Sequence, residues 1–203
     1  LIYFLKSCST KKILLLFLFI SSYAFAQEIT FPLLDNWTFR QVATDKWMPA
    51  EIPGTVHTDL LINGKIEDPL YRMNEKDQQW IDKEDWEYKT MFQASSEIIT
   101  RDRILLDFQG LDTYADIYLN DSLILSANNM FRSWQVDVEG IIRQGENSLL
   151  IYFTLPIKKT EPIYDSLNFM YPVSSNDQSD KKVSIFSRKA PYHYGWDWGP
   201  RFV

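Results

Sequence analysis

Cysteine is almost absent from this sequence. Its only cysteine, Cys8, lies inside an N-terminal apolar segment that we expect to be removed. Without that segment the chain has no thiol, so it can form neither a disulfide nor a cysteine-based metal site. The position of Cys8 also argues against a lipid-anchored cysteine, because it does not follow a cleavage site directly. A hydrophobic core alone must therefore hold the fold together, and roughly 177 residues are enough to bury one.

Histidine and glycine are also scarce, and their positions exclude several kinds of active site. The only histidines, His57 and His193, do not stand at metal-ligand spacing. The seven glycines form neither a G-x-G-x-x-G phosphate loop nor a G-x-S-x-G nucleophile elbow. The acid pairs Glu84-Asp85 and Asp112…Asp116 stand in polar connections or on alternating strands, where solvent exposure explains them. We therefore expect no catalytic residue, no metal and no cofactor in this chain.

Positive charge is in short supply as well. The whole sequence has 21 basic and 27 acidic residues. Three of the lysines and none of the acids belong to the first 26 residues, so the remainder carries 18 basic residues and a net charge of −9. This acidic balance disfavours nucleic acid and anionic membranes as partners.

The first 26 residues have the pattern of an export signal. Lys6, Lys11 and Lys12 form a positive region, residues 13–20 are an uninterrupted apolar run, and Ala24-Phe25-Ala26 has the small-x-small cleavage pattern. The apolar run is far shorter than the ~20 residues that a membrane-spanning helix needs. We therefore expect cleavage after Ala26, export to the periplasm or the medium, and no membrane attachment afterwards.

Residues 27–203 read as one all-β domain. Apolar and aromatic residues recur with period two, turn residues separate the segments at intervals of roughly 8–12 residues, and Asn120-Asp121 predicts a hairpin turn. This spacing is typical of an antiparallel sandwich. Residues 103–108 are more uniformly apolar, which predicts a strand covered on both faces. The predicted strands are 86–92, 103–108, 114–120, 122–127, 132–138 and 148–154, with one or two outer strands near 37–39 and 47, and the predicted core includes Ile117, Leu119, Leu149 and Ile151.

Two other segments do not follow the strand pattern. Residues 55–63 predict a short helix that begins at Thr55, ends before Gly64 and buries Val56, Leu60 and Leu61. His57 lies beside that apolar stripe and is interpreted as a structural histidine. Residues 174–180 are rich in Ser, Asn and Asp, which predicts a flexible surface loop.

The stretch Arg188–Arg201 has the most suggestive composition. Its two glycines and two prolines do not suit the interior of a strand or helix, so it predicts a shaped loop. Trp196 and Trp198 alternate with Asp197, and in an extended chain both indoles would lie on one side. An indole can cover the apolar face of a sugar ring while a carboxylate accepts hydrogen bonds from hydroxyls. The alternative is that both tryptophans anchor the core, since tryptophan is usually mostly buried, and that Asp197 caps a turn.

Eight blocks that occur in order along the chain are far more specific than the Trp-Asp-Trp triplet alone. They are Pro53–Leu61, Asp68–Tyr71, Asn74-Glu75, Gln79–Ile81, Asp85–Tyr88, Gly110–Asn120, Ala127–Arg132 and Arg188–Arg201. Together they resemble the N-terminal part of the β-mannosidases of glycoside hydrolase family 2. The resemblance covers essentially all of residues 27–203.

This resemblance implies a jelly-roll sandwich like that of galactose-binding domains. In the family it is followed by an immunoglobulin-like domain and a (β/α)₈ barrel, which carries the acid/base and nucleophile glutamates of a retaining mechanism. Neither glutamate is present up to Val203, so the chain alone is expected to be inactive. The resemblance also implies that Trp196, Asp197 and Trp198 line the pocket for a terminal mannosyl unit, with Asp197 bonded to hydroxyls remote from the scissile bond.

Three hypotheses follow for the function. In the first, the chain is the N-terminal part of an exo-β-mannosidase, with β-mannoside oligosaccharides or glycan ends and its own catalytic domain as partners. In the second, it is a stand-alone carbohydrate-binding module. In the third, the sandwich only supports the barrel. Because the sequence stops directly after the Trp-Asp-Trp motif, we expect the first.

Overall fold

The computed structural model describes residues 29–203, of which residues 33–203 form one compact unit. The predicted export signal and its cleavage site lie outside the described residues. Within residues 29–203, no helix combines the length and hydropathy needed to cross a membrane.

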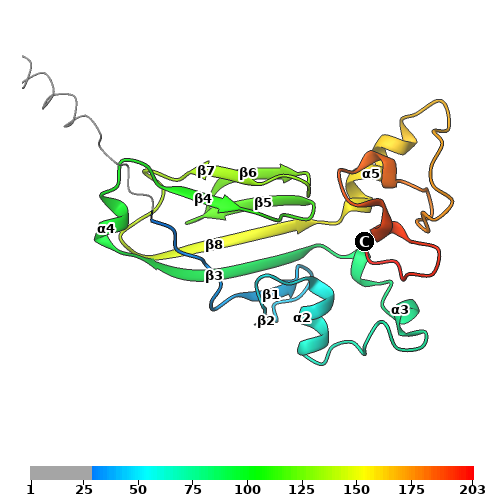
Figure 1. Ribbon diagram of the computed structural model, residues 1–203, viewed down its shortest axis with the longest axis horizontal. Coiled ribbons are helices and arrows are strands. Elements are labelled where there is room, and N and C mark those ends of the chain that lie inside the picture. Colours follow the sequence, from blue (N-terminus) through cyan, green and yellow to red (C-terminus); the bar gives the residue numbers. More distant parts are fainter. Residues whose placement is uncertain (1–28) are drawn as a thin grey trace, which may run out of the picture. The chain divides into compact units, whose positions relative to one another are not determined.

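Two antiparallel sheets make up the body of this unit (Figure 1). The larger has six strands in the order β2-β1-β3-β8-β5-β6, and the smaller pairs β4 with β7. The predicted all-β, antiparallel class is confirmed. The strands are β1 (Thr38–Gln41), β2 (Met48–Pro49), β3 (Trp86–Ala94), β4 (Leu105–Phe108), β5 (Tyr114–Leu119), β6 (Ser122–Asn128), β7 (Trp134–Asp137) and β8 (Gly145–Thr154).

The centre of the large sheet is the pair β3 and β8. They stay in register from Trp86↔Phe153 to Ala94↔Gly145, and β8 pairs with β5 along its other edge. Side chains that alternate toward the small sheet form the core, as their period of two requires. All four predicted core residues are buried, with exposed fractions of 0% for Ile117 and Leu119, 2% for Leu149 and 7% for Ile151.

The predicted hairpin between β5 and β6 is confirmed. Asn120 and Asp121 both have positive φ, 50° and 66°, which is the conformation that a two-residue type I′ turn needs. The Asn120 amide also donates to the Ile141 carbonyl oxygen at 3.0 Å. This bond ties the turn to the segment before β8.

The prediction for residues 103–108 was wrong in one respect. β4 is a strand, but it is not covered on both faces, since Leu105 is 38% exposed. Within residues 29–203, β4 pairs with β7 alone. The small sheet that they form has solvent on its outer side. Leu106 and Phe108 alone pack toward the core.

The predicted short helix is present as α2 (Val56–Ile62). The Thr55 hydroxyl caps its first turn by accepting from the Thr58 amide, and Gly64 follows its end with φ = +62°. Leu60 is buried as expected, whereas Leu61 is 39% exposed. The other helical segments are α3 (Asn74–Asp77), η1 (Ile81–Lys83), α4 (Ser96–Ile99), α5 (Pro156–Asp165), η2 (Ser184–Phe186) and η3 (Pro191–Tyr194).

We expect Ile117→Ala to lower the free energy of unfolding by ~2–5 kcal/mol, because a fully buried side chain leaves a cavity when it is shortened. Leu123→Ala on the adjacent strand β6 is the control. Leu123 is 56% exposed, so its truncation should change stability by no more than about 0.5 kcal/mol. Denaturant unfolding of both variants measures the difference, and equal losses would contradict the core assignment.

Candidate functional site

The candidate site lies at the end of the sandwich where β3 begins and β8 ends. Figure 1 shows α3, α5 and the C-terminal end of the chain gathered there. Residues 188–203 reach this end after a short parallel bridge between Asn129 and Arg188, where the Met130 amide donates to the Arg188 carbonyl oxygen at 3.1 Å. The last segment of the chain is thus fastened to the loop that leads from β6 to β7.

The three predicted site residues are brought together at the surface. Trp196 is 49% exposed, Trp198 is 78% exposed, and Asp197 between them is exposed as well. The two indole rings lie side by side, with centroids 4.8 Å apart and planes tilted by 42°. The alternative that these tryptophans anchor the core is therefore wrong, because neither ring is buried.

The backbone conformation of Gly195 determines the direction in which the chain enters this triplet. Its φ of +134° is a conformation that residues with a side chain rarely adopt. A Cβ at this position would also collide with the carbonyl oxygen of Asn176 and lie 2.8 Å from the Gln178 Cγ. The loop is this close to residues 176–178 because the Gln178 amide donates to the Tyr194 carbonyl oxygen at 2.8 Å.

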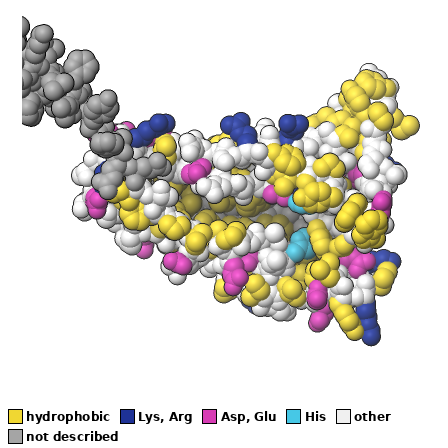
Figure 2. All heavy atoms as spheres, viewed as in Figure 1, with side chains coloured by type: hydrophobic (Ala, Val, Ile, Leu, Met, Phe, Trp, Pro, Cys, Tyr) yellow, Lys and Arg dark blue, Asp and Glu magenta, His cyan; other side chains and the backbone are white. Residues whose placement is uncertain are grey.

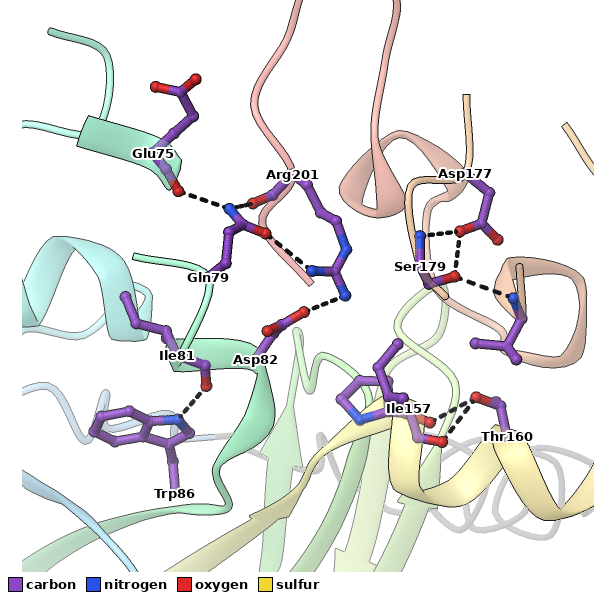
Figure 3. A network of polar contacts seen from close by, with 12 residues as sticks. Glu75, Gln79, Ile81, Asp82, Trp86, Ile157, Thr160, Asp177, Ser179 and Arg201 are labelled. Atoms are coloured by element: carbon purple, nitrogen blue, oxygen red, sulfur yellow. Dashed lines mark hydrogen bonds and ion pairs between the residues drawn. The ribbon is translucent and has the colours of Figure 1, made fainter. Parts of the chain in front are cut away.

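Residues 174–180, which lie against the Trp-Asp-Trp loop, form a surface loop as predicted, but two of its side chains are buried. Asp177 and Ser179 are only 3% and 6% exposed. The Asp177 carboxylate accepts from the Ser179 amide at 2.9 Å (Figure 3) and from the Ser184 amide, also at 2.9 Å. Burial opposes ionisation of Asp177, but these hydrogen bonds outweigh it and lower the pKa. The sequence does not predict these internal contacts, because a polar composition does not reveal which polar groups satisfy one another.

Arg201 fastens the far side of the same loop. Its guanidinium Nη1 donates to the Gln79 Oε1 at 2.9 Å, and the Gln79 Nε2 donates back to the Arg201 carbonyl oxygen at 3.1 Å. The guanidinium also forms an ion pair with Asp82, and both side chains are largely buried (Figure 3). Burial raises the pKa of Asp82, and Arg201 opposes that rise. Sequence reasoning singled out Gln79 only as part of a block and missed Asp82, since the two stand about 120 residues from Arg201.

A cleft of about 860 Å³ opens beside the triplet. Residues 196–201 form one wall, residues 69–83 form the opposite wall, and the start of α5 and residues 178–180 complete it. Figure 2 shows hydrophobic side chains gathered at this end of the unit. The strongly exposed apolar side chains in the segments that line the cleft are Leu70, Tyr71, Met73, Trp196 and Trp198, and Phe169, Met170 and Tyr192 are exposed outside those segments.

His57 behaves as a structural residue, as predicted. Its ring packs on Phe202, with centroids 4.7 Å apart. Burial, with the charges of Lys189 and His193, lowers its pKa to about 4. His57 is therefore neutral at pH 7.

The exposed-acid interpretation was wrong for Asp85, whose side chain is 11% exposed, whereas Asp112 is exposed as expected but also paired. The Lys189 Nζ lies 2.6 Å from Asp112, and Asp85 accepts from Lys158, Tyr152 and the Leu155 amide. Both acids join segments that are distant in sequence, which spacing along the chain cannot show. Asp116 does fit the expectation, since it accepts only from Ser126 in an exposed position. Across residues 29–203, no cluster of three or more His, Cys, Asp or Glu side chains is placed to hold a metal ion.

Comparison with known proteins gives matches over most of the chain. The family model described as glycosyl hydrolase 2 galactose-binding domain-like matches residues 37–203. The chain is 35% identical over 188 residues to beta-mannosidase B of Aspergillus niger and 36% identical over 181 residues to that of Neosartorya fischeri, covering 87% and 84% of this chain. It covers only 21% and 20% of those proteins, so it spans about a fifth of the length of these relatives.

Two solved structures share the fold. The beta-D-mannosidase of Dictyoglomus thermophilum matches 84% of this chain and 20% of its own at 39% identity, with a TM-score of 0.78. The exo-chitosanase of Amycolatopsis orientalis matches 62% of this chain and 16% of its own at 22% identity, with a TM-score of 0.55. The second likeness concerns the fold alone.

His57 should make stability depend on pH. Its pKa is about 4 in the fold and 6.5 in the unfolded chain, so between these values the unfolded chain binds more protons. Unfolding free energy should therefore fall as the pH drops from 6.5 toward 4. His57→Gln, which cannot be protonated, should lose less stability between pH 7.5 and pH 5 than the parent. Parallel denaturant titrations at the two pH values measure this, and equal losses would contradict a neutral buried His57.

Proposed function

Because the chain belongs to the glycosyl hydrolase 2 galactose-binding domain-like family, we propose that it is the N-terminal domain of a retaining exo-β-mannosidase. That enzyme would remove terminal, non-reducing β-D-mannose residues from oligosaccharides or glycan ends. The observation that carries the proposal is the exposed Trp196-Asp197-Trp198 triplet, held at the mouth of a cleft. The identity of 35–39% to β-mannosidases supports it.

Each residue of the triplet would have a distinct role. An indole ring of Trp196 or Trp198 offers a flat apolar surface for the C–H face of a mannosyl ring. The exposed Asp197 carboxylate would accept hydrogen bonds from hydroxyls remote from the bond that breaks. Such remote contacts orient the sugar and supply binding energy that can be used in the transition state.

Bond cleavage would fall to a partner domain of the same enzyme. In retaining glycosidases two carboxyl groups about 5–5.5 Å apart act as nucleophile and acid/base, and we assign neither to this chain. The chain by itself would therefore not hydrolyse mannosides. The exposed apolar side chains around the cleft, among them Leu70 at 75% and Met73 at 54%, would pack against the catalytic domain.

The proposal includes export. Residues 1–26 carry the pattern of a cleavable signal, so the enzyme would work in the periplasm or outside the cell. A stand-alone carbohydrate-binding module is not favoured, because the β-mannosidases that resemble this chain contain it as one fifth of a longer protein.

In the enzyme that includes the catalytic domain, Asp197→Ala should lower kcat/KM for a terminal β-mannoside by ~10- to 150-fold. A hydrogen bond to a charged group contributes ~1.5–3 kcal/mol, and each 1.36 kcal/mol is a factor of ten. The melting temperature should not change, because Asp197 is exposed and neither donates nor accepts a hydrogen bond within residues 29–203. Steady-state kinetics and thermal unfolding on the same preparation measure both.

Asp102→Ala is the matched control, since Asp102 is an exposed acid next to α4, outside the cleft. It should leave kcat/KM unchanged. An Asp197→Ala enzyme with the kinetics of the parent would assign the loop to a purely supporting role.

A further inference from the structure

We propose that Asp112, which lies outside the cleft, positions the Trp-Asp-Trp loop by holding the base of that loop in place. Its effect on activity rests on the proposed function, in which the loop contacts the sugar. Asp112 lies two residues before β5 and is not one of the residues that line the cleft. Its partners, Lys189 and His193, both belong to the segment that leads into the triplet.

The contact with Lys189 is an ion pair between a buried lysine and a partly exposed carboxylate. Lys189 Nζ lies 2.6 Å from Asp112 Oδ2, and the lysine side chain is only 3% exposed while that of Asp112 is 33% exposed. Burial alone would raise the pKa of Asp112, but its contacts with His193 and Lys189 lower it well below the usual range. Because an unpaired buried ammonium is strongly unfavourable, Lys189 can keep this position only while Asp112 is opposite it.

The second contact reaches the base of the loop. His193 Nδ1 lies 3.4 Å from the same carboxylate oxygen of Asp112. The carbonyl oxygen of His193 accepts from the Phe202 amide at 2.9 Å, which closes residues 193–202 into a loop with the triplet near its middle. The Phe202 ring then rests on His57. The Asp112 carboxylate therefore pairs with Lys189 and lies close to His193 on the segment that enters the loop, and His193 is in turn bonded to the segment that leaves it.

The contacts of Arg201 do not replace those of Asp112, because they hold a different part of the loop. The contacts of Arg201 hold the segment that leaves the loop against Gln79 and Asp82, on the opposite wall of the cleft. Without Asp112, the segment from Lys189 to His193 would keep contacts only at its two ends. Met130 contacts the Arg188 carbonyl oxygen and the Ala190 amide at its start, and the Gln178 amide donates to the Tyr194 carbonyl oxygen just after it. The triplet should then sample several positions instead of one.

A spin label at position 197 tests the proposal independently of any activity. The 203-residue chain carries Cys8→Ser and Asp197→Cys, which leaves one thiol on the exposed tip of the loop. Adding Asp112→Ala should mobilise the label. Adding Asp116→Ala should leave the mobility of the label unchanged, although it removes the same charge four residues further on. Within residues 29–203 the Asp116 carboxylate accepts a hydrogen bond only from Ser126. Should Asp112→Ala fail to fold, the isosteric Asp112→Asn takes its place with the same expected direction.

An unchanged label spectrum in a folded Asp112 variant would overturn the proposal. In the enzyme with its catalytic domain, Asp112→Ala should lower kcat/KM by about ten- to a hundredfold, the effect expected of a displaced positioning group. The loss should be much smaller when Asp197→Ala is already present, because the two changes act through one loop. A mobilised label with unchanged kinetics would confirm that Asp112 positions the loop and would contradict the proposed role of the loop in sugar binding.

Discussion

The antiparallel pairing of β3 with β8 is the constraint on which the site depends. These strands run side by side from Trp86↔Phe153 to Ala94↔Gly145, so the segment before β3 and the segment after β8 emerge at the same end of the sheet. Asp85 joins these two segments, because its carboxylate accepts from the Leu155 amide at 2.9 Å and from Lys158 at 2.7 Å. Residues about 120 apart in the chain can therefore form opposite walls of one cleft, although neither segment is part of a sheet.

A chain without disulfides holds these irregular segments with carboxylates that are buried or, at Asp112, partly exposed. Each such acid joins a segment outside the sheets to a strand or to another loop, and each is largely satisfied by a cation, a hydroxyl or backbone amides. Removing one partner leaves a buried polar group unpaired, so these contacts fix the geometry strongly even where they add little net stability. The contacts are Asp59 with Tyr88, Asp85 with Tyr152 and Lys158, Asp112 with Lys189, Asp177 with Ser184, and Asp82 with Arg201.

How much the sequence predicts depends on whether a feature is local. Period-two alternation located most of the main strands and a uniformly apolar run located β4. The turn residues Asn120 and Asp121 fixed the hairpin, and Gly64 marked the end of α2, because each signal lies within a few residues. Helix α5 was not predicted, since Pro162 lies inside it and proline disfavours a helix interior. The true surroundings of Asp112 and Asp177 were missed because their partners are fixed by the fold and not by spacing. Trp196-Asp197-Trp198 was found from composition, yet only the structure shows that its indoles are exposed.

The central claim is that the Trp-Asp-Trp loop contributes to the mannosyl pocket of a larger enzyme. A crystal structure of the enzyme with its catalytic domain and a bound non-hydrolysable terminal β-mannoside would test it most directly. The account predicts that a carboxylate oxygen of Asp197 lies within hydrogen-bond distance, about 2.5–3.0 Å, of a hydroxyl of the terminal sugar. It also predicts that an indole of the triplet contacts the same ring. A bound sugar that touches none of residues 196–198 would contradict the account.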